Sequence, residues 1–414
     1  MKKIGSSVFF LFVVVAFFGL QSHAGADEQK AYTLDELISI AVAKNPSVAV
    51  FKARLEAAKA GIVSARAYPN PDIEFQGGNA KSLETLKTRN EYSMGISQPL
   101  ELPQKRFYRR QAAEAGAESL EKDSDNFRIE VIAEVKKSFY LALLNKTVLD
   151  ITVANYRTIE ELFKSVSVRV KAGEAPEFEL VKAKVELLRA DKELKRAANK
   201  LVISKASLNA LLGNSLEDGF EIAGAFILRK EKIALNQLLS RAIMNHPLIL
   251  KSKKDVEAKG FSLEMEKASI FPDITIKAGV VRELDRESYT MGISMPLPIW
   301  YQRKGEIATA SAEKSWAEAE LHRKEVELSK AILEEHHNYL IAYDQIEIFE
   351  KGLLKQAEEA LRIAELSYTQ GESGILDYID AQRVYLITIM EYYQSFFELE
   401  AAMASLEKVS GGLP

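Results

Sequence analysis

Two carboxylates stand three residues apart late in the sequence, Asp377 and Asp380, within the segment SYTQGESGILDYIDAQ (367–382). Residues three apart lie on neighbouring parts of one helix face, so the two side chains can act together. Two like charges about 4 Å apart repel by about 4 kcal/mol at an effective dielectric near 20, so bringing such carboxylates together needs a reason beyond stability, and attracting cations is one. A structural alternative stays open, because the helix dipole stabilises acidic residues in a first turn by about 0.3 to 1 kcal/mol.

The other residue types that could do chemistry form no catalytic pattern. The histidines beyond the N-terminal segment are His246, His322, His336 and His337, and none has the spacing of a zinc hydrolase. His336 and His337 follow two glutamates, but adjacent helix residues point in different directions, which favours an exposed polar patch. There is no cysteine, and no G-x-S-x-G, P-loop or G-x-G-x-x-G motif. We therefore expect no catalytic residues, no metal site and no cofactor.

The N-terminus has the pattern of a cleavable signal peptide over residues 1–26. Lys2 and Lys3 precede an apolar run from Val8 to Phe18, and Ala24-Gly25-Ala26 forms an A-x-A cleavage site. The run is shorter than the roughly 20 residues of a membrane helix, and no later segment approaches that length. With 55 basic and 59 acidic residues the chain is mildly acidic, which gives no support for nucleic-acid binding. We expect an exported protein without lipidation, since no cysteine is available to accept a lipid.

The sequence contains one unit twice. The pairs that match are AVAKNPSV (41–48) with AIMNHPLI (242–249) and Pro71-Asp72-Ile73 with Pro272-Asp273-Ile274, both 201 positions apart, YSMGISQPL (92–100) with YTMGISMPL (289–297), 197 apart, and Gly173 with Gly371 and Gly213 with Gly411, both 198 apart. Matches in the same order with nearly constant offsets indicate an internal duplication. The predicted organisation is a first repeat at 27–213, a linker at 214–232 and a second repeat at 233–414.

Each repeat reads as a helix, a pair of strands, a very long helix and a returning helix. Residues 33–67 have helical spacing, and prolines follow them. Residues 104–172 contain no proline and predict a helix of about 100 Å, with an equivalent helix at 302–370. Helices of this length pack side by side as a bundle or coiled coil. Gly173 and Gly371 are expected to end them and to mark the tips of two helical hairpins.

The segments between the helices alternate with a period of two and predict β-hairpins at about 72–98 and 272–295. One face carries larger apolar side chains, namely Tyr92, Met94, Ile96, Tyr289, Met291 and Ile293. The other face is small and weakly polar, and charges gather in the connections 81–91 and 282–287. This pattern suits the wall of an outer-membrane barrel whose larger face meets lipid, while a small soluble sheet packed on a core remains the alternative.

Four strands cannot close into a barrel. Open edges leave backbone groups that hydrocarbon cannot satisfy, so the wall must combine several chains. Two chains would give a barrel of eight strands filled by side chains, whereas three give twelve strands and a lumen. A pore therefore requires at least a trimer.

The two strand-to-helix junctions, QPLELPQKR (98–106) and MPLPIWYQRK (295–304), together with the two tips, resemble the TolC-like outer-membrane efflux proteins. The resemblance runs from Tyr32 to Gly411 and, in compactness and the absence of a long tail, is strongest to the cobalt-zinc-cadmium efflux branch. It implies a mainly α fold with a membrane β-barrel, and a homotrimer whose twelve-stranded barrel stands on a long helical periplasmic tunnel. It further implies an exit duct for metal cations or other toxic solutes, supplied by a periplasmic adaptor and an inner-membrane pump of the RND type.

The resemblance also assigns roles to residues of the tips. Asp377 and Asp380 match the carboxylates that line the narrowest part of the tunnel, and Glu179 is the equivalent of Asp377 in the first tip. Tyr368 matches the tip tyrosine of the family. Ser373 stands where the family has the arginine of a locking contact. The locking of the closed state is therefore undetermined, as is the solute.

Two other classes of protein are weighed against the channel. A periplasmic adaptor also has long helical hairpins, but it has one hairpin flanked by small β modules rather than a duplicated pattern. An exported enzyme lacks any nucleophile, base or metal signature in this sequence.

The first prediction concerns processing. We expect the mature protein to begin at Asp27, to carry no lipid and to be recovered with the outer membrane. N-terminal sequencing and intact mass measurement check this directly. A start more than a few residues away, a lipid mass or recovery in the soluble periplasm would contradict it.

Overall fold

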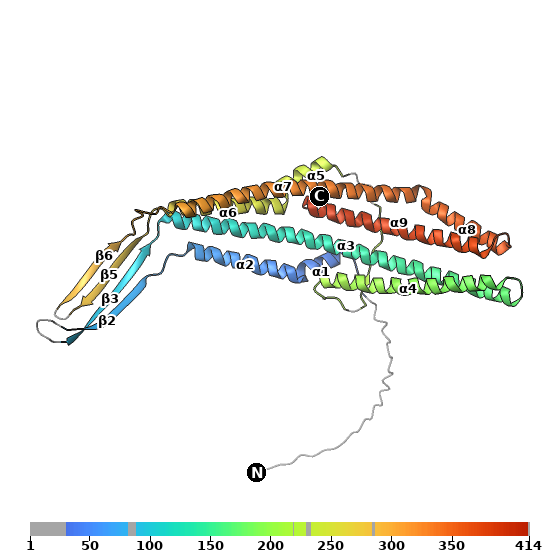
Figure 1. Cartoon of the computed structure of the whole chain (residues 1–414), viewed down its shortest axis with the longest axis horizontal. Coiled ribbons are helices and arrows are strands. Elements are labelled where there is room, and N and C mark those ends of the chain that lie inside the picture. Colours follow the sequence, from blue (N-terminus) through green and yellow to red (C-terminus); the bar gives the residue numbers. More distant parts are fainter. Residues whose placement is uncertain (1–29, 82–87, 218, 229–232, 284–285, 413–414) are drawn as a thin grey trace, which may run out of the picture.

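The chain folds into a long, narrow molecule with its β-sheet at one end and paired helices at the other (Figure 1). The structure is a computed structural model that describes residues 30–81, 88–217, 219–228, 233–283 and 286–412. The predicted signal peptide, residues 1–26, lies outside the described residues. So do parts of the linker and of the two connections in which charges gather.

The two repeats have the same order of main elements. In the first repeat these are β1 (Ala31–Tyr32), α1 (Leu34–Lys44), α2 (Pro46–Arg66), β2 (Asp72–Lys81), β3 (Thr88–Leu100), α3 (Pro103–Lys171) and α4 (Glu177–Leu211). After β4 (Glu221–Ile222), the second repeat has α5 (Leu235–Asn245), α6 (Pro247–Ala268), β5 (Ile274–Arg282), β6 (Glu287–Ser294), α7 (Lys304–Ile348), η1 (Phe349–Leu353), α8 (Leu354–Gln370) and α9 (Ile375–Ser410).

The helix predicted over residues 33–67 is in fact two helices, α1 and α2, which meet at Asn45. Pro46 fits the first position of α2, where no amide hydrogen is needed, but it ends the helix before it. The Asn45 side chain caps α2 by accepting a hydrogen bond from the Ser47 amide, and it donates to the Leu211 carbonyl, both at 2.9 Å. One side chain thus joins the start of α2 to the end of α4.

His246 does the same work in the second repeat, between α5 and α6. Its Nδ1 accepts a hydrogen bond from the Leu248 amide at 3.1 Å, and its Nε2 lies 3.2 Å from the Lys408 carbonyl near the end of α9. This bonding requires a neutral ring with the hydrogen on Nε2. The two joints therefore share a geometry but differ in their response to protons.

The first long helix is continuous and the second is not. Helix α3 contains 69 residues and follows the predicted range closely. The prediction of one continuous helix over 302–370 was wrong, because η1 interrupts the helix between α7 and α8. Gly352 in this segment has φ 141°, a conformation that favours glycine, and the first repeat has Ala154 at the equivalent position. The second hairpin is consequently kinked.

The four long strands form one antiparallel sheet in the order β2-β3-β5-β6. Strands β3 and β5 pair across the two repeats, while β2 and β6 lie at the edges. The short strands β1 and β4 pair in parallel near the middle of the molecule. Each chain thus brings a four-stranded sheet with two unpaired edges.

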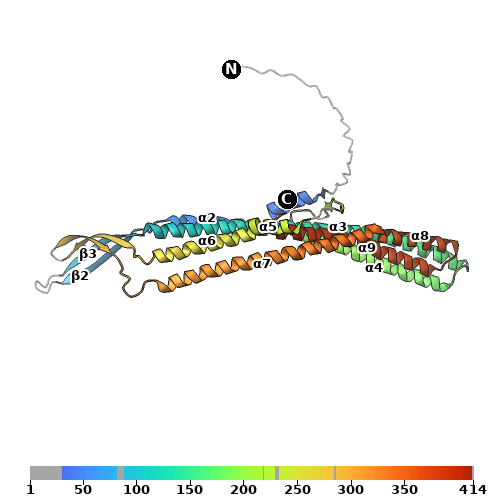
Figure 2. The same ribbon diagram turned by 90° about the horizontal axis from the view of Figure 1, so that it is seen from above.

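Helix α3 is the central helix on which several others pack. On the side of the sheet it packs against α2 and α6, and toward the tips it packs against α4 and α9 (Figure 2). Buried residues form two central clusters, one around Val135 and Leu208 and the other around Ile332 and Leu406. A third cluster joins α3, α4, α8 and α9 near the tips. Among the described helices, none is both long enough and apolar enough to cross a membrane.

The second prediction concerns His246. Burial lowers the pKa of this ring below its ordinary value. The pKa of a histidine in the unfolded chain is about 6.5. Because the folded protein binds this proton less readily, the joint contributes its full stability above about pH 6.5 and loses it as the pH falls toward the lowered pKa. We expect His246→Asn, which copies Asn45, to weaken the dependence of thermal unfolding on pH between about 7 and 5.

The matched control is His322→Asn, because the side chain of His322 is 79% exposed. Thermal unfolding of the detergent-solubilised protein at both pH values provides the measurement. An unchanged pH dependence in His246→Asn, or the same change in His322→Asn, would show that the joint does not titrate.

Candidate functional site

The strand register gathers apolar side chains on one face of the sheet. Cross-strand partners form rows such as Ile73, Ile96, Ala278 and Met291, or Phe75, Met94, Val280 and Tyr289. The six residues predicted to face lipid, Tyr92, Met94, Ile96, Tyr289, Met291 and Ile293, all lie on this face. On β6 they are 77 to 89% exposed in the single chain. A continuous exposed apolar surface of this kind requires a membrane or another protein to cover it.

The opposite face is more charged than the alternation on β3 and β6 indicates. Small and polar residues do occupy the middle of this face, among them Ser97, Gly95 and Gly279. Asp72 and Glu74 from β2 and Lys277 from β5 lie beside them in the same cross-strand rows. The prediction of a small, weakly polar face follows from the alternation on β3 and β6, and it is wrong for β2 and β5, which contribute these charges.

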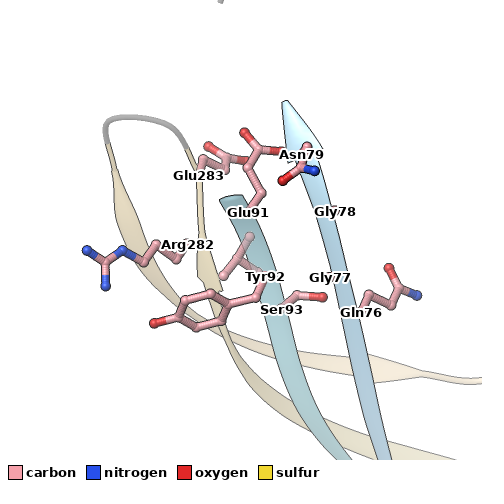
Figure 3. A pocket seen from close by; sticks show the side chains of 10 residues that line it. Gln76, Gly77, Gly78, Asn79, Glu91, Tyr92, Ser93, Arg282 and Glu283 are labelled. Carbon is pink, nitrogen blue, oxygen red and sulfur yellow. The ribbon is translucent and has the colours of Figure 1, made fainter. Parts of the chain in front are cut away.

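The polar end of the sheet lies next to the hairpin connections (Figure 3). Tyr92 and Arg282 extend to one side of the sheet and Gln76 to the other, while Asn79, Glu91 and Glu283 gather at the strand ends. The guanidinium carbon of Arg282 lies 5.9 Å from the centre of the Tyr92 ring. An aromatic ring beside a long cationic side chain is typical of a boundary between an apolar band and water.

The two helix tips use the same turn. Gly173 and Gly371 both have φ 77°, in the left-handed region. The amide of Glu174 donates to the Arg169 carbonyl and the amide of Glu372 donates to the Ser367 carbonyl, each at 2.8 Å. This turn satisfies the last helix carbonyls and reverses the chain within a few residues. Both tips lie at the same end of the molecule (Figure 1).

Tyr368 connects the two tips. Its ring stacks on Tyr378 with centres 5.7 Å apart, and the Arg169 guanidinium donates to its hydroxyl at 3.2 Å. Burial raises the pKa of Tyr368, and it raises the pKa of Tyr378 to about 12. Both phenols are therefore neutral at ordinary pH. Sequence reasoning missed Arg169, and its only signal was a basic residue in the last turn of a long helix.

Glu179 lies close to this tyrosine rather than on the outside. It is half-buried, its charge contributes to the raised pKa of Tyr368, and its Oε2 has no hydrogen-bond partner among the described residues. The hydroxyl of Ser373 is likewise buried, and no described residue bonds to it. The resemblance places an arginine at position 373, but in this chain the arginine near Tyr368 comes from the first tip.

Asp377 and Asp380 are exposed in the first turns of α9. The Arg383 guanidinium lies beside Asp380, with Nη1 4.0 Å from the Asp380 carboxylate. The structure therefore brings Glu179 and Tyr368 together in the tip and leaves the two aspartates on its surface.

The histidine pair was predicted to be an exposed polar patch, and this is wrong for His336. That ring is buried, with Nε2 3.0 Å from the Ile233 carbonyl, while His337 is exposed. Within the described ranges, no three His, Cys, Asp or Glu side chains are grouped closely enough to hold a metal ion.

The model of the family "Outer membrane efflux protein" matches residues 37–214 and 238–412, one segment in each repeat. The chain belongs to this family. A cobalt-zinc-cadmium resistance protein, CzcC of Cupriavidus metallidurans, is 25% identical over 92% of this chain and 90% of its own length. The pyoverdine export outer membrane protein OpmQ of Pseudomonas putida is 21% identical over 92% of this chain and 86% of its own. The CmeC outer membrane channel of Campylobacter jejuni has the same fold, with a TM-score of 0.81 at 17% identity over 92% of this chain and 85% of that one.

Membership of the family decides among the classes weighed from the sequence. The protein is an outer-membrane channel subunit of the tripartite efflux type with a periplasmic helical extension, not an enzyme. The family model matches both repeats, whereas an adaptor has no reason to carry the duplicated strand and helix pattern.

The third prediction tests the two faces of the sheet. We expect Ile293→Arg, on the apolar face, to prevent stable membrane assembly, because an arginine on the lipid face of a barrel costs about 2 to 4 kcal/mol near the midplane. The neighbouring substitution Ser294→Arg places the same side chain on the opposite face and should assemble better. Quantifying folded protein in outer-membrane fractions compares the two variants. If Ile293→Arg assembles and Ser294→Arg does not, the faces have been assigned in reverse.

Proposed function

We propose that three copies of the chain assemble in the outer membrane into a twelve-stranded barrel on a helical periplasmic tunnel. The assembly is a passive exit duct that releases metal cations to the outside. A periplasmic adaptor and an inner-membrane pump of the RND type deliver the cations. The mature chain reaches the outer membrane after loss of residues 1–26, without lipidation.

The unpaired edges of the sheet support a trimer. The long sheet in the described part of a single chain has four strands with β2 and β6 at its edges, and three such sheets supply the twelve strands of a barrel with a lumen. Helix α4 adds a second argument, because its apolar residues Phe178, Val181, Val185 and Leu188 are all exposed. Their spacing of three and four residues is typical of a stripe that packs on another helix. A neighbouring copy supplies that helix.

The carboxylates of the tip support cations as the solute. Asp377 and Asp380 are exposed on consecutive turns of α9. With three copies around an axis they place six carboxylates at one level of the tunnel, where they attract cations and repel anions. Similarity to the cobalt-zinc-cadmium resistance protein agrees with this substrate class, while similarity to the pyoverdine export protein keeps organic solutes as the competing class.

The tip also contains a contact suited to holding the tunnel closed. Arg169 donates a hydrogen bond to Tyr368 across the two tips, and Glu179 interacts with the same tyrosine through its charge and has one oxygen without a partner in the described part of the chain. When the tunnel opens, the two tips of a chain must either break the contact between Arg169 and Tyr368 or move as one unit. The contact between Arg169 and Tyr368 compensates for Ser373 in place of the arginine of the family.

The fourth prediction tests the cation constriction. We expect Asp377→Asn combined with Asp380→Asn to weaken cation preference in single-channel recordings and to relieve block by multivalent cations, because the charge that attracts them is gone. The amount of trimer in the membrane should stay unchanged, since both side chains are exposed. Glu179→Gln should act more mildly, by raising the open probability.

Resistance of cells to cobalt, zinc and cadmium separates the two classes of solute. If the duct serves metal cations, the double variant lowers resistance at unchanged protein level. Unchanged ion selectivity in the double variant would show that the two aspartates are only helix-start carboxylates, and the proposed constriction would be wrong.

A further inference from the structure

The pairing of strands at the joint between the two repeats is a model for the pairing that the edge strands of one chain need from a neighbouring chain. Strand β3 of the first repeat pairs with β5 of the second. Strand β6 is the duplicate of β3, and β2 is the duplicate of β5, as the matching segments at 92–100 and 289–297 and the two Pro-Asp-Ile triplets show. Both duplicates lie at edges of the sheet, where the described residues provide no further strand. In the proposed trimer, β6 of each chain meets β2 of the next.

The glycines fix the register of that contact. Gly95 lies opposite Gly279 in the joint within the chain. A Cβ atom at Gly279 would come within 2.9 Å of the Met94 carbonyl, so the backbones approach closely there. The duplicates of these two residues are Gly292 on β6 and Gly78 on β2. Apart from their own chain neighbours, no described residue of the single chain has an atom within 4 Å of a Cβ built at either glycine. Each edge strand thus has a glycine at the position that is equivalent to a glycine in the closely packed pairing of β3 with β5.

We propose that β6 of one subunit pairs antiparallel with β2 of the next, with Gly292 opposite Gly78 of the partner subunit. This inference rests on the trimer proposed above and adds the register of its seam. It places Ser294 opposite Gln76 of the partner subunit, as Ser97 lies opposite Lys277 within the chain. It also keeps Phe75 and Ile73 on the same face as Met291 and Ile293, so the apolar face continues around the barrel.

The same equivalence gives an ion pair below the sheet. Within the chain, Lys105 at the start of α3 donates to the Asp273 carboxylate at 2.7 Å. The duplicates are Arg303, just before α7, and Asp72 at the start of β2. Asp72 is exposed and has no ion pair within the described part of one chain. Arg303 uses its Nε and Nη2 groups on Glu266, which leaves Nη1 for a second carboxylate. We assign that carboxylate to Asp72 of the partner subunit.

The proposed contact between subunits continues along the helices that adjoin the strands, α7 of one chain and α2 of the partner subunit. Glu118 of α3 pairs with Lys254 of α6 within the chain, at 2.7 Å. The duplicates are Trp316 of α7 and Ala53 of α2, both exposed. A large ring therefore faces a small residue where the internal joint has an ion pair. Trp316 is 65% exposed in the single chain, and the seam covers it with α2 of the partner subunit.

The test uses engineered cysteines, which are clean because the chain has none. Gln76→Cys with Ser294→Cys forms a disulfide between subunits, since paired strands bring Cα atoms within the reach of a disulfide, about 4.4 to 6.8 Å. Oxidised trimers then run as covalent dimers and trimers on a denaturing gel. Ser97→Cys with Lys277→Cys is the matched variant at the internal joint, and it loses free thiols on oxidation without forming covalent dimers.

Two shifted pairs test the register. Ser294→Cys with Gly78→Cys or with Glu74→Cys separates the cysteines by two residues, about 7 Å along the strand, and should cross-link poorly. A shifted pair that cross-links better than Gln76 with Ser294, or trimers in which none of these pairs cross-links, overturns the proposed seam but leaves the trimer in place. A protein that stays monomeric in mild detergent overturns the proposed assembly as well.

A double-mutant cycle tests the ion pair separately. Asp72→Asn and Arg303→Gln should each lower the temperature at which the trimer dissociates, and the double variant should lose less than the sum of the two. Lys105→Gln with Asp273→Asn provides the matched cycle within the chain. Additive losses for Asp72 and Arg303 would show that the two side chains do not meet.

Discussion

The edges of the four-stranded sheet are the constraint on which the rest of the structure depends. Strands β2 and β6 present backbone N–H and C=O groups that no other described strand satisfies. In water such edges invite association, and in hydrocarbon each unsatisfied group costs several kcal/mol. The sheet also has an apolar face, from Phe75 to Met291, whose exposure to water is unfavourable. A membrane channel of this family therefore cannot be complete as one chain, and the two repeats provide the geometry for closing it.

Duplication gives that geometry at several levels. Asn45 and His246 fasten the starts of α2 and α6 to the ends of α4 and α9. Gly173 and Gly371 reverse the chain in the same conformation. Because equivalent joints hold equivalent helices, the two halves lie side by side with their strands at one end and their tips at the other (Figure 2). The contact between halves of one chain is thus a physical guide to the contact between chains.

The sequence predicted those features whose cause is local or repeated. Alternation over 92–100 gave the strand faces, and a span of 104–172 free of proline gave α3. Pro46 and Gly352 also act locally, and each could have been recognised as a break in a predicted helix. Contacts between distant segments could not be predicted. Arg169 and Tyr368 are 199 residues apart, and the burial of His336 depends on the Ile233 carbonyl, 103 residues away.

The differences between the two repeats are as informative as their likeness. Helix α3 runs unbroken to the first tip, whereas η1 interrupts the path to the second, and only the second tip has exposed aspartates at its start. The unbroken half supplies Arg169, and the kinked half supplies Tyr368, Tyr378 and the aspartates. A kink lets α8 and the start of α9 lie at an angle to the α7 axis, so the hairpin with the carboxylates can incline differently from the straight hairpin beside it. The kink lies at Gly352, whose φ of 141° favours glycine, and the first repeat, which has Ala154 at the equivalent position, remains straight.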